Sequence, residues 1–186
     1  MLGLRGSAVA RRGGGGYESG VDELGFPDLH HARAAEGWLE LGNPADAARE
    51  LRRLSEEARQ HPDVLEVSWR LFATRQRWTS ALAVARRLTR KCPSRATGWI
   101  HQSYSLHELK RTPEAWRLLL PVAERFPDDS TIPYNLACYA CQMGDVAAAK
   151  QWLGRAAKQR GRDEVRAMGL DDPDLEPLRG YLEGDF

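Results

Sequence analysis

The chain has 186 residues, of which 42% are apolar and 28% charged, proportions that fit a soluble globular domain. Its 27 Lys and Arg residues nearly balance its 26 Asp and Glu residues, so overall charge favours neither nucleic acid nor a membrane surface as a partner. No apolar run approaches the ~20 residues that cross a bilayer, and no apolar core of a secretory signal stands near residue 1. We therefore expect a cytoplasmic protein.

The first segment, residues 1–26, is rich in glycine and lacks periodic apolar residues. It is predicted to be a disordered tail. The glycines at 13–16 do not fit a phosphate-binding loop, because no strand precedes them and no Gly-Lys-Ser/Thr follows.

A regular period of about 34 residues begins after this tail. Ala47, Ala81, Ala115 and Ala149 are separated by the same interval each time. Three further columns keep the same register: Leu51, Ala85, Leu119 and Leu153; Leu54, Leu88, Val122 and Ala156; Trp38, Phe72, Leu106 and Ala140. Four uninterrupted repeats result within residues 27–163, at 28–61, 62–95, 96–129 and 130–163.

Inside each repeat the apolar spacing is helical. Two apolar stripes are separated by a short breaker: "LGNP" at 41–44, "QRW" at 76–78, "KRTP" at 110–113 and "MGD" at 143–145. Each repeat is thus predicted to be two antiparallel helices, with the alanine column where they cross closely. A single hairpin cannot bury both stripes, so the hairpins must stack.

These features resemble the tetratricopeptide repeat (TPR) family in the 34-residue period, the alanine column, Leu41-Gly42, Met143-Gly144 and the closing Pro93 and Pro127. Gln76 and Lys110 depart from the glycine usual in that family. The resemblance implies an all-α fold, an α-α superhelix (solenoid) of four 34-residue hairpins with a C-terminal capping helix.

After residue 163 the period stops. Residues 164–186 are predicted to be a capping segment. "DEVRAMGL" is expected to form another helix, and a further helical segment is expected to begin with Asp172 as N-cap and Pro173 as first helical residue. Leu175, Leu178 and Leu182 are expected to cover the exposed edge of the last repeat.

Cys138 and Cys141 raise the question of a metal or redox site. On a helix their Cβ atoms lie ~5–6 Å apart, whereas a disulfide requires about 3.8 Å. Zinc needs at least three protein ligands, and the obvious third one is His107. We favour the cysteines as small helix-surface residues and predict no metal and no cofactor. A metal-binding or enzymatic protein using His107, Cys138 and Cys141 remains the alternative.

In TPR proteins the first helices line a concave groove that binds peptides. Carried over by position, the resemblance assigns the following residues to such a groove: Glu36, Glu66, Arg70, Ile100, Tyr104, His107, Tyr134, Cys138, Cys141 and Gln142. Asn135 resembles a carboxylate-binding asparagine of the family, but its basic companions are missing, so no carboxylate clamp is predicted.

The second repeat is strongly basic. Arg86, Arg87, Arg90 and Lys91 share one helical patch, which gives a second alternative, nucleic-acid binding. We favour a solvated helix face there and expect no nucleic-acid or membrane partner.

The sequence thus predicts a non-enzymatic protein-interaction module, an adaptor, scaffold or chaperone-like component that binds a peptide segment of a protein partner in the groove. No HExxH, GxSxG or GxGxxG segment points to catalysis. The partner's identity and the oligomeric state do not follow from the residues.

Overall fold

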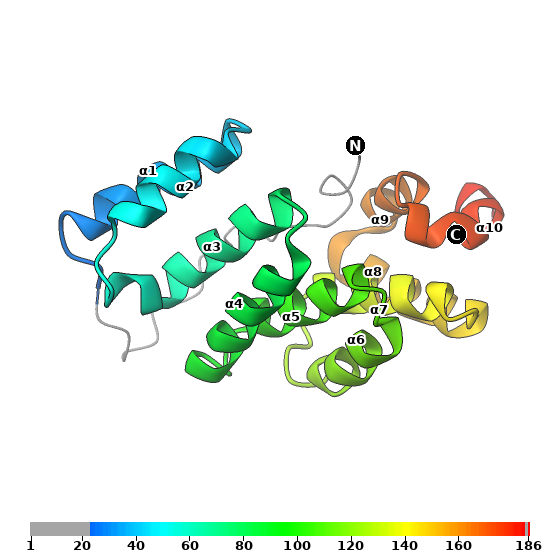
Figure 1. The fold of residues 1–186 in the computed structure, drawn as a ribbon. Helices are drawn as coiled ribbons and strands as arrows, with labels where there is room; N and C mark the ends of the chain where they lie inside the picture. Colours follow the sequence, from blue (N-terminus) through cyan, green and yellow to red (C-terminus); the bar gives the residue numbers. More distant parts are fainter. Residues whose placement is uncertain (1–22, 185) are drawn as a thin grey trace. The chain divides into compact units, whose positions relative to one another are not determined.

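The structure, a computed structural model, describes residues 23–184 and 186. The predicted tail therefore lies largely outside the described residues. Every regular element in the described part is helical (Figure 1), which confirms the all-α prediction. The α-helices are α1 (Asp28–Glu40), α2 (Pro44–Arg53), α3 (Pro62–Thr74), α4 (Trp78–Lys91), α5 (Ala96–Glu108), α6 (Thr112–Leu119), α7 (Thr131–Gln142), α8 (Val146–Arg160), α9 (Arg162–Leu170) and α10 (Arg179–Glu183). Short 3₁₀ turns are η1 (Ala58–Gln60), η2 (Leu120–Val122) and η3 (Pro173–Leu178).

The chain divides into two compact units at the step from Ser105 to Leu106, within α5. The N-terminal unit holds the described residues up to Ser105, and the C-terminal unit begins at Leu106.

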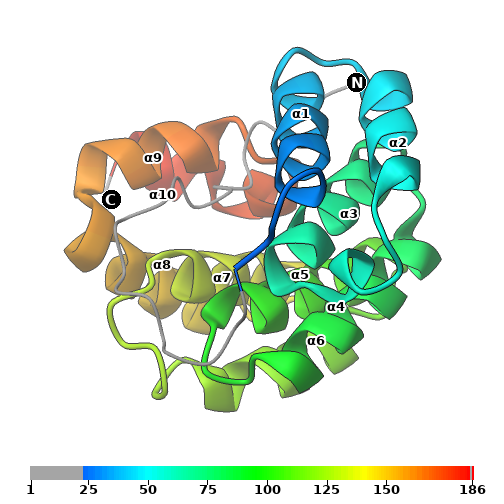
Figure 2. The same cartoon turned by 90° about the vertical axis from the view of Figure 1, so that its left-hand side faces the viewer.

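In the N-terminal unit, α1 packs on α2 and α3 packs on α4. Figure 2 shows α1 and α2 side by side. Ala47 and Ala81 are 0% exposed, as close crossing of two helices requires. Gly98 lets α5 approach α4, because a Cβ there would lie 2.9 Å from the Thr89 hydroxyl.

In the C-terminal unit, α7 packs on α8, and α9, η3 and α10 follow. Ala149 is fully buried in the hairpin. Leu175, Leu178 and Leu182 are fully buried as well, and η3 packs on α7 while α9 packs on α8. The predicted N-cap is also present, since the Asp172 carboxylate accepts the Asp174 N–H at 3.0 Å.

The turns between paired helices repeat one backbone conformation. Gly42, Gln76, Lys110 and Gly144 all have positive φ, at 72°, 53°, 62° and 83°. The first helix of each pair ends before the predicted breaker, and the second begins within the breaker or directly after it. Gln76 and Lys110 thus adopt the left-handed conformation that glycine takes at the same position elsewhere in the chain.

Two elements differ from a uniform repeat. The helix α6 ends at Leu119, because Pro121 lacks the N–H needed to continue it, and the chain passes into η2. The segment after Asp172 is a 3₁₀ turn before it becomes the short helix α10.

Within the described residues, no helix is both long enough and apolar enough to cross a membrane.

Candidate functional site

The residues assigned to the groove in the N-terminal unit begin with a pair that joins α1 to α3. Glu36 and Arg70 occupy equivalent positions in successive repeats. The Arg70 guanidinium donates to the Glu36 carboxylate with an N–O distance of 3.0 Å. Both side chains are partly exposed, so the pair is reachable from solvent.

A second group of polar contacts joins α3 to the start of α5. The Glu66 carboxylate accepts the Thr97 hydroxyl at 2.9 Å and lies 3.7 Å from the Arg95 guanidinium. Arg95 also donates to Asp63 at 2.9 Å. The face formed by α1 and α3 is therefore lined with charged side chains that bridge successive first helices.

Ile100 and Tyr104, assigned to the same set, take part in packing. Ile100 is buried. The Tyr104 ring lies edge-on to Trp69 and Trp78, with centroid distances of 6.2 and 5.6 Å. Tyr104 as a whole is half-buried.

His101, which the sequence did not single out, is a buried polar residue of this unit. Its ring stacks on Trp69 at 3.6 Å with the planes 3° apart, and Trp69 donates its indole N–H to the Ser105 hydroxyl at 2.9 Å. Burial, assisted by the nearby Arg70 charge, lowers the pKa of His101 to about 3. The imidazole is therefore neutral at neutral pH. Its Nδ1 atom has no hydrogen-bond partner among the described residues.

In the C-terminal unit, the assigned residues contact the chain's own C-terminal segment, residues 171–178. The Tyr134 hydroxyl donates to the Asp172 carboxylate at 3.0 Å, and the Cys138 thiol lies 3.7 Å from it. The His107 Nε2 atom lies 2.8 Å from the Asp174 carboxylate, and the Gln142 amide donates to the Asp174 carbonyl at 3.0 Å.

Burial accompanies these contacts. Tyr134, Cys138, Cys141 and His107 are each at most 5% exposed, whereas Gln142 is exposed. The C-terminal segment thus covers the part of α7 on which the resemblance to TPR proteins would place a bound peptide. The sequence pattern does not reveal this contact, because Asp172 and Tyr134 lie far apart along the chain.

The electrostatics of this cluster favour protonated thiols. Burial raises the pKa of Cys138 well above its ordinary value, and the neighbouring Asp172 charge adds to the effect. Burial also raises the pKa of Cys141 and that of Tyr134. The pKa of Asp172 is itself raised by burial, although the Asp174 N–H and the Tyr134 hydroxyl oppose the shift. Because a thiolate is the reactive and metal-binding form, these cysteines are poorly suited to nucleophilic chemistry at neutral pH.

The alternative metal site depends on His107, Cys138 and Cys141. Both cysteines are free thiols. The two ring nitrogens of His107 contact Thr112 and Asp174, at 3.0 and 2.8 Å. No group of three or more His, Cys, Asp and Glu side chains in the described part of the chain is arranged to hold a metal ion.

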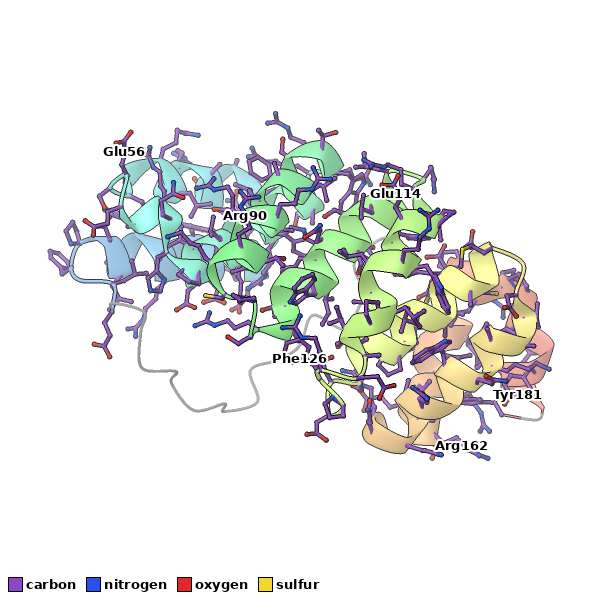
Figure 3. The ribbon with its side chains drawn as sticks, turned by 90° about the horizontal axis from the view of Figure 1, so that it is seen from below. Glu56, Arg90, Glu114, Phe126, Arg162 and Tyr181 are labelled. Carbon is purple, nitrogen blue, oxygen red and sulfur yellow. The ribbon has the colours of Figure 1, made fainter. Side chains whose placement is uncertain are left out.

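The basic patch of the second repeat, Arg86, Arg87, Arg90 and Lys91, lies on α4. Arg86 and Arg90 are exposed, and Arg87 is partly exposed and donates to the Gln60 side-chain carbonyl at 2.5 Å. Arg90 is labelled in Figure 3.

Comparison with known proteins supports the fold. No family model matches the sequence, and no curated protein matches it either. Among solved structures, the chain is similar to TTC0263, a thermophilic TPR protein of Thermus thermophilus, with a TM-score of 0.66 and 16% sequence identity. The match covers 84% of this chain and 95% of that one. The chain thus has a TPR-like fold of helices packed in consecutive pairs.

Proposed function

We propose that this chain is a non-enzymatic protein-interaction module, in which four 34-residue hairpins stack into a superhelix and a peptide segment of a partner binds across the first helices. The TPR-like fold supports a protein partner, because stacked helical hairpins present extended surfaces of this kind. The observation that carries the proposal is the partly exposed, charged face of α1 and α3, where Glu36 and Arg70 pair across successive hairpins.

The partner's contact belongs on the N-terminal unit. In the C-terminal unit, Tyr134, His107 and Gln142 already hold Asp172 and Asp174 of the chain itself. Displacing that segment would also expose Leu175 and Leu178, which are fully buried. A partner that binds the face of α1 and α3 meets no such cost.

The contact of the C-terminal segment illustrates the binding chemistry. The Gln142 amide binds a main-chain carbonyl of the segment, and His107 and Tyr134 bind its carboxylates. Side chains assigned to the groove on α1 and α3 are Glu36, Glu66 and Arg70. Their mixed charge suits a polar peptide, with Arg70 as the donor to a carboxylate or a main-chain carbonyl.

Selection from a displayed library of random peptides tests the proposal. We expect the immobilised protein to enrich peptides that bind in solution and that lose at least tenfold in affinity with the variant Arg70→Glu. Arg86→Glu is the matched control, because it makes the same charge change on an exposed position of α4.

Fluorescence anisotropy with a selected peptide gives the affinities. Equal losses in Arg70→Glu and Arg86→Glu would assign binding to general electrostatics and contradict the proposal, as would a failure to enrich any peptide. Circular dichroism of each variant separates loss of binding from loss of folding.

A further inference from the structure

The opposite side of α3 bears a pocket that the proposed function does not use. It has a volume of about 590 Å³ and lies entirely within the N-terminal unit. Successive residues of a helix are about 100° apart, so the pocket-lining Val64, Ser68 and Leu71 project from α3 away from Glu66 and Arg70. Arg75, directly after α3, also lines the pocket. The pocket is therefore separate from the charged face of α1 and α3.

The floor of this pocket is apolar. It is formed by Leu51 of α2, by Val64, Leu71 and Phe72 of α3, and by Val84 of α4. Leu51 and Phe72 are only partly buried. The floor thus offers apolar surface but few hydrogen-bonding groups, which disfavours nucleotide bases and favours the side chains of an amphipathic ligand.

The rim of the pocket consists of arginines. Arg52, Arg59, Arg75 and Arg87 all line it, and the first three are exposed. Three of the four donate to neutral oxygens. Arg59 donates to the Arg52 backbone carbonyl and Arg75 to the Pro44 backbone carbonyl. Arg87 donates to the Gln60 side-chain carbonyl.

No carboxylate is ion-paired with these arginines in the described part of the chain. Glu56 and Glu57 line an adjoining hollow together with Arg59 and Arg87, but neither forms an ion pair with them. By contrast, Arg49 and Arg53, on the same helix as Arg52, pair with Asp46 and Glu50. The four rim arginines therefore have no direct ion pair with a carboxylate of the described residues.

We infer that this pocket binds an acidic amphipathic helix of a partner protein, with apolar side chains on the floor and carboxylates paired to the arginine rim. From Val64 to Arg75 the pocket follows α3 for ~16 Å, which matches about three turns of a bound helix. An amphipathic helix that lays its apolar face into an apolar groove is a recurrent recognition mode, in which residues spaced by three and four supply the anchors. The charge of the rim selects helices with acidic flanks.

The probe is a fluorescein-labelled synthetic peptide about four helical turns long, with leucines at helical spacing of three and four and glutamates on both flanks. A second peptide keeps the leucines and carries lysines in place of the glutamates, and a third scrambles the acidic sequence. We expect the full-length protein to bind the acidic peptide at least tenfold more tightly than either control in fluorescence anisotropy.

Two double variants locate the site. Arg59→Glu with Arg87→Glu reverses the rim and is expected to weaken binding of the acidic peptide at least tenfold. Arg86→Glu with Arg90→Glu makes the same change of charge beside the pocket, on residues that do not line it, and is expected to change affinity less than twofold. Methyl NMR of the unmutated protein supplies a readout without substitutions: peptide-induced shifts should centre on Leu51, Leu71 and Val84.

Equal losses in the two double variants, or equal binding of the acidic and scrambled peptides, would overturn the inference. A third result would also overturn it: the protein shows no preference for the acidic peptide, and both double variants equally reduce its retention on heparin or on phosphatidylserine vesicles. The arginines would then act as a general basic surface. Arg70 does not line the pocket, so Arg70→Glu tests binding at the face of α1 and α3 alone. The proposed function and the pocket inference can therefore fail independently.

Discussion

At the residue scale, His101 contributes to the response of the N-terminal unit to acid. The folded unit keeps this imidazole neutral, since burial lowers its pKa to about 3, whereas in the unfolded chain it takes up a proton below pH ~6.5. Its contribution to stability is therefore complete above pH ~6.5 and is lost progressively as the pH falls towards 3.

We predict that, through His101, the free energy of unfolding falls by about 2 kcal/mol when the pH is lowered from 6.5 to 5. Urea denaturation of the unmutated protein and of His101→Gln at both pH values measures this, because the difference between the two proteins cancels groups such as Asp172, whose raised pKa acts in the opposite direction. Identical pH dependence in the two proteins would show that His101 is protonated in the folded state.

At the residue level, the burial of the alanine column was predicted correctly, whereas Trp38 of another repeat column is exposed. Ala47, Ala81, Ala115 and Ala149 are all fully buried, as their column predicts. The buried His101 and the half-buried Asp172 were not predicted to take part in packing, because their partners Trp69 and Tyr134 belong to distant parts of the chain. Only the packed structure brings those pairs together. Whether the assigned groove residues bind a peptide stays a prediction.

At the element scale, two of the turns between paired helices contain a non-glycine residue in the left-handed backbone conformation. Gln76 and Lys110 have φ values of 53° and 62°, in the region that costs a side-chain-bearing residue ~1 kcal/mol or more. Glycine at these positions removes this backbone cost. It also increases the conformational entropy of the unfolded chain, which offsets part of the added stability.

We predict that Gln76→Gly stabilises the protein by about 0.5–1 kcal/mol. Thr74→Gly is the control two residues earlier, at the end of α3, where glycine should destabilise by up to about 1 kcal/mol. Thermal denaturation followed by circular dichroism compares the two variants. A lower melting temperature for Gln76→Gly than for the unmutated protein would mean that the Gln76 side chain contributes contacts larger than the backbone cost.

Helix ends were the most predictable elements, because each breaker combines turn residues with a change of apolar stripe. Asn43 and Asp145 accept backbone N–H groups of α2 and α8 as N-caps. The early end of α6 and the 3₁₀ geometry of η3 were not predicted. Both follow from local proline chemistry, at Pro121 and around Pro173 and Pro177, which a repeat pattern does not include.

At the scale of the whole molecule, the C-terminal segment stabilises the last hairpin. Leu175 is fully buried, and a Cβ on Gly169 would meet it at 3.4 Å and meet Leu182 at 3.0 Å. The segment covers apolar surface that an unfinished repeat stack would expose.

We predict that Leu175→Ala lowers the unfolding free energy of the C-terminal unit by about 2–5 kcal/mol. Hydrogen exchange of the α7 and α8 amides should accelerate accordingly. Glu176→Ala, at an exposed neighbouring position, is expected to change stability by no more than about 0.5 kcal/mol. Unchanged exchange in Leu175→Ala would show that the segment is not part of the folded core.

Site-specific photo-crosslinking tests the central claim, that a partner binds across the first helices of the N-terminal unit. A photoreactive amino acid replaces Thr74, an exposed residue one helical turn after Arg70, or Ala83, an exposed residue of α4. Addition of a selected peptide should give a crosslinked product from position 74 and none from position 83. Crosslinking from position 83 alone, or equally from both, would contradict the account.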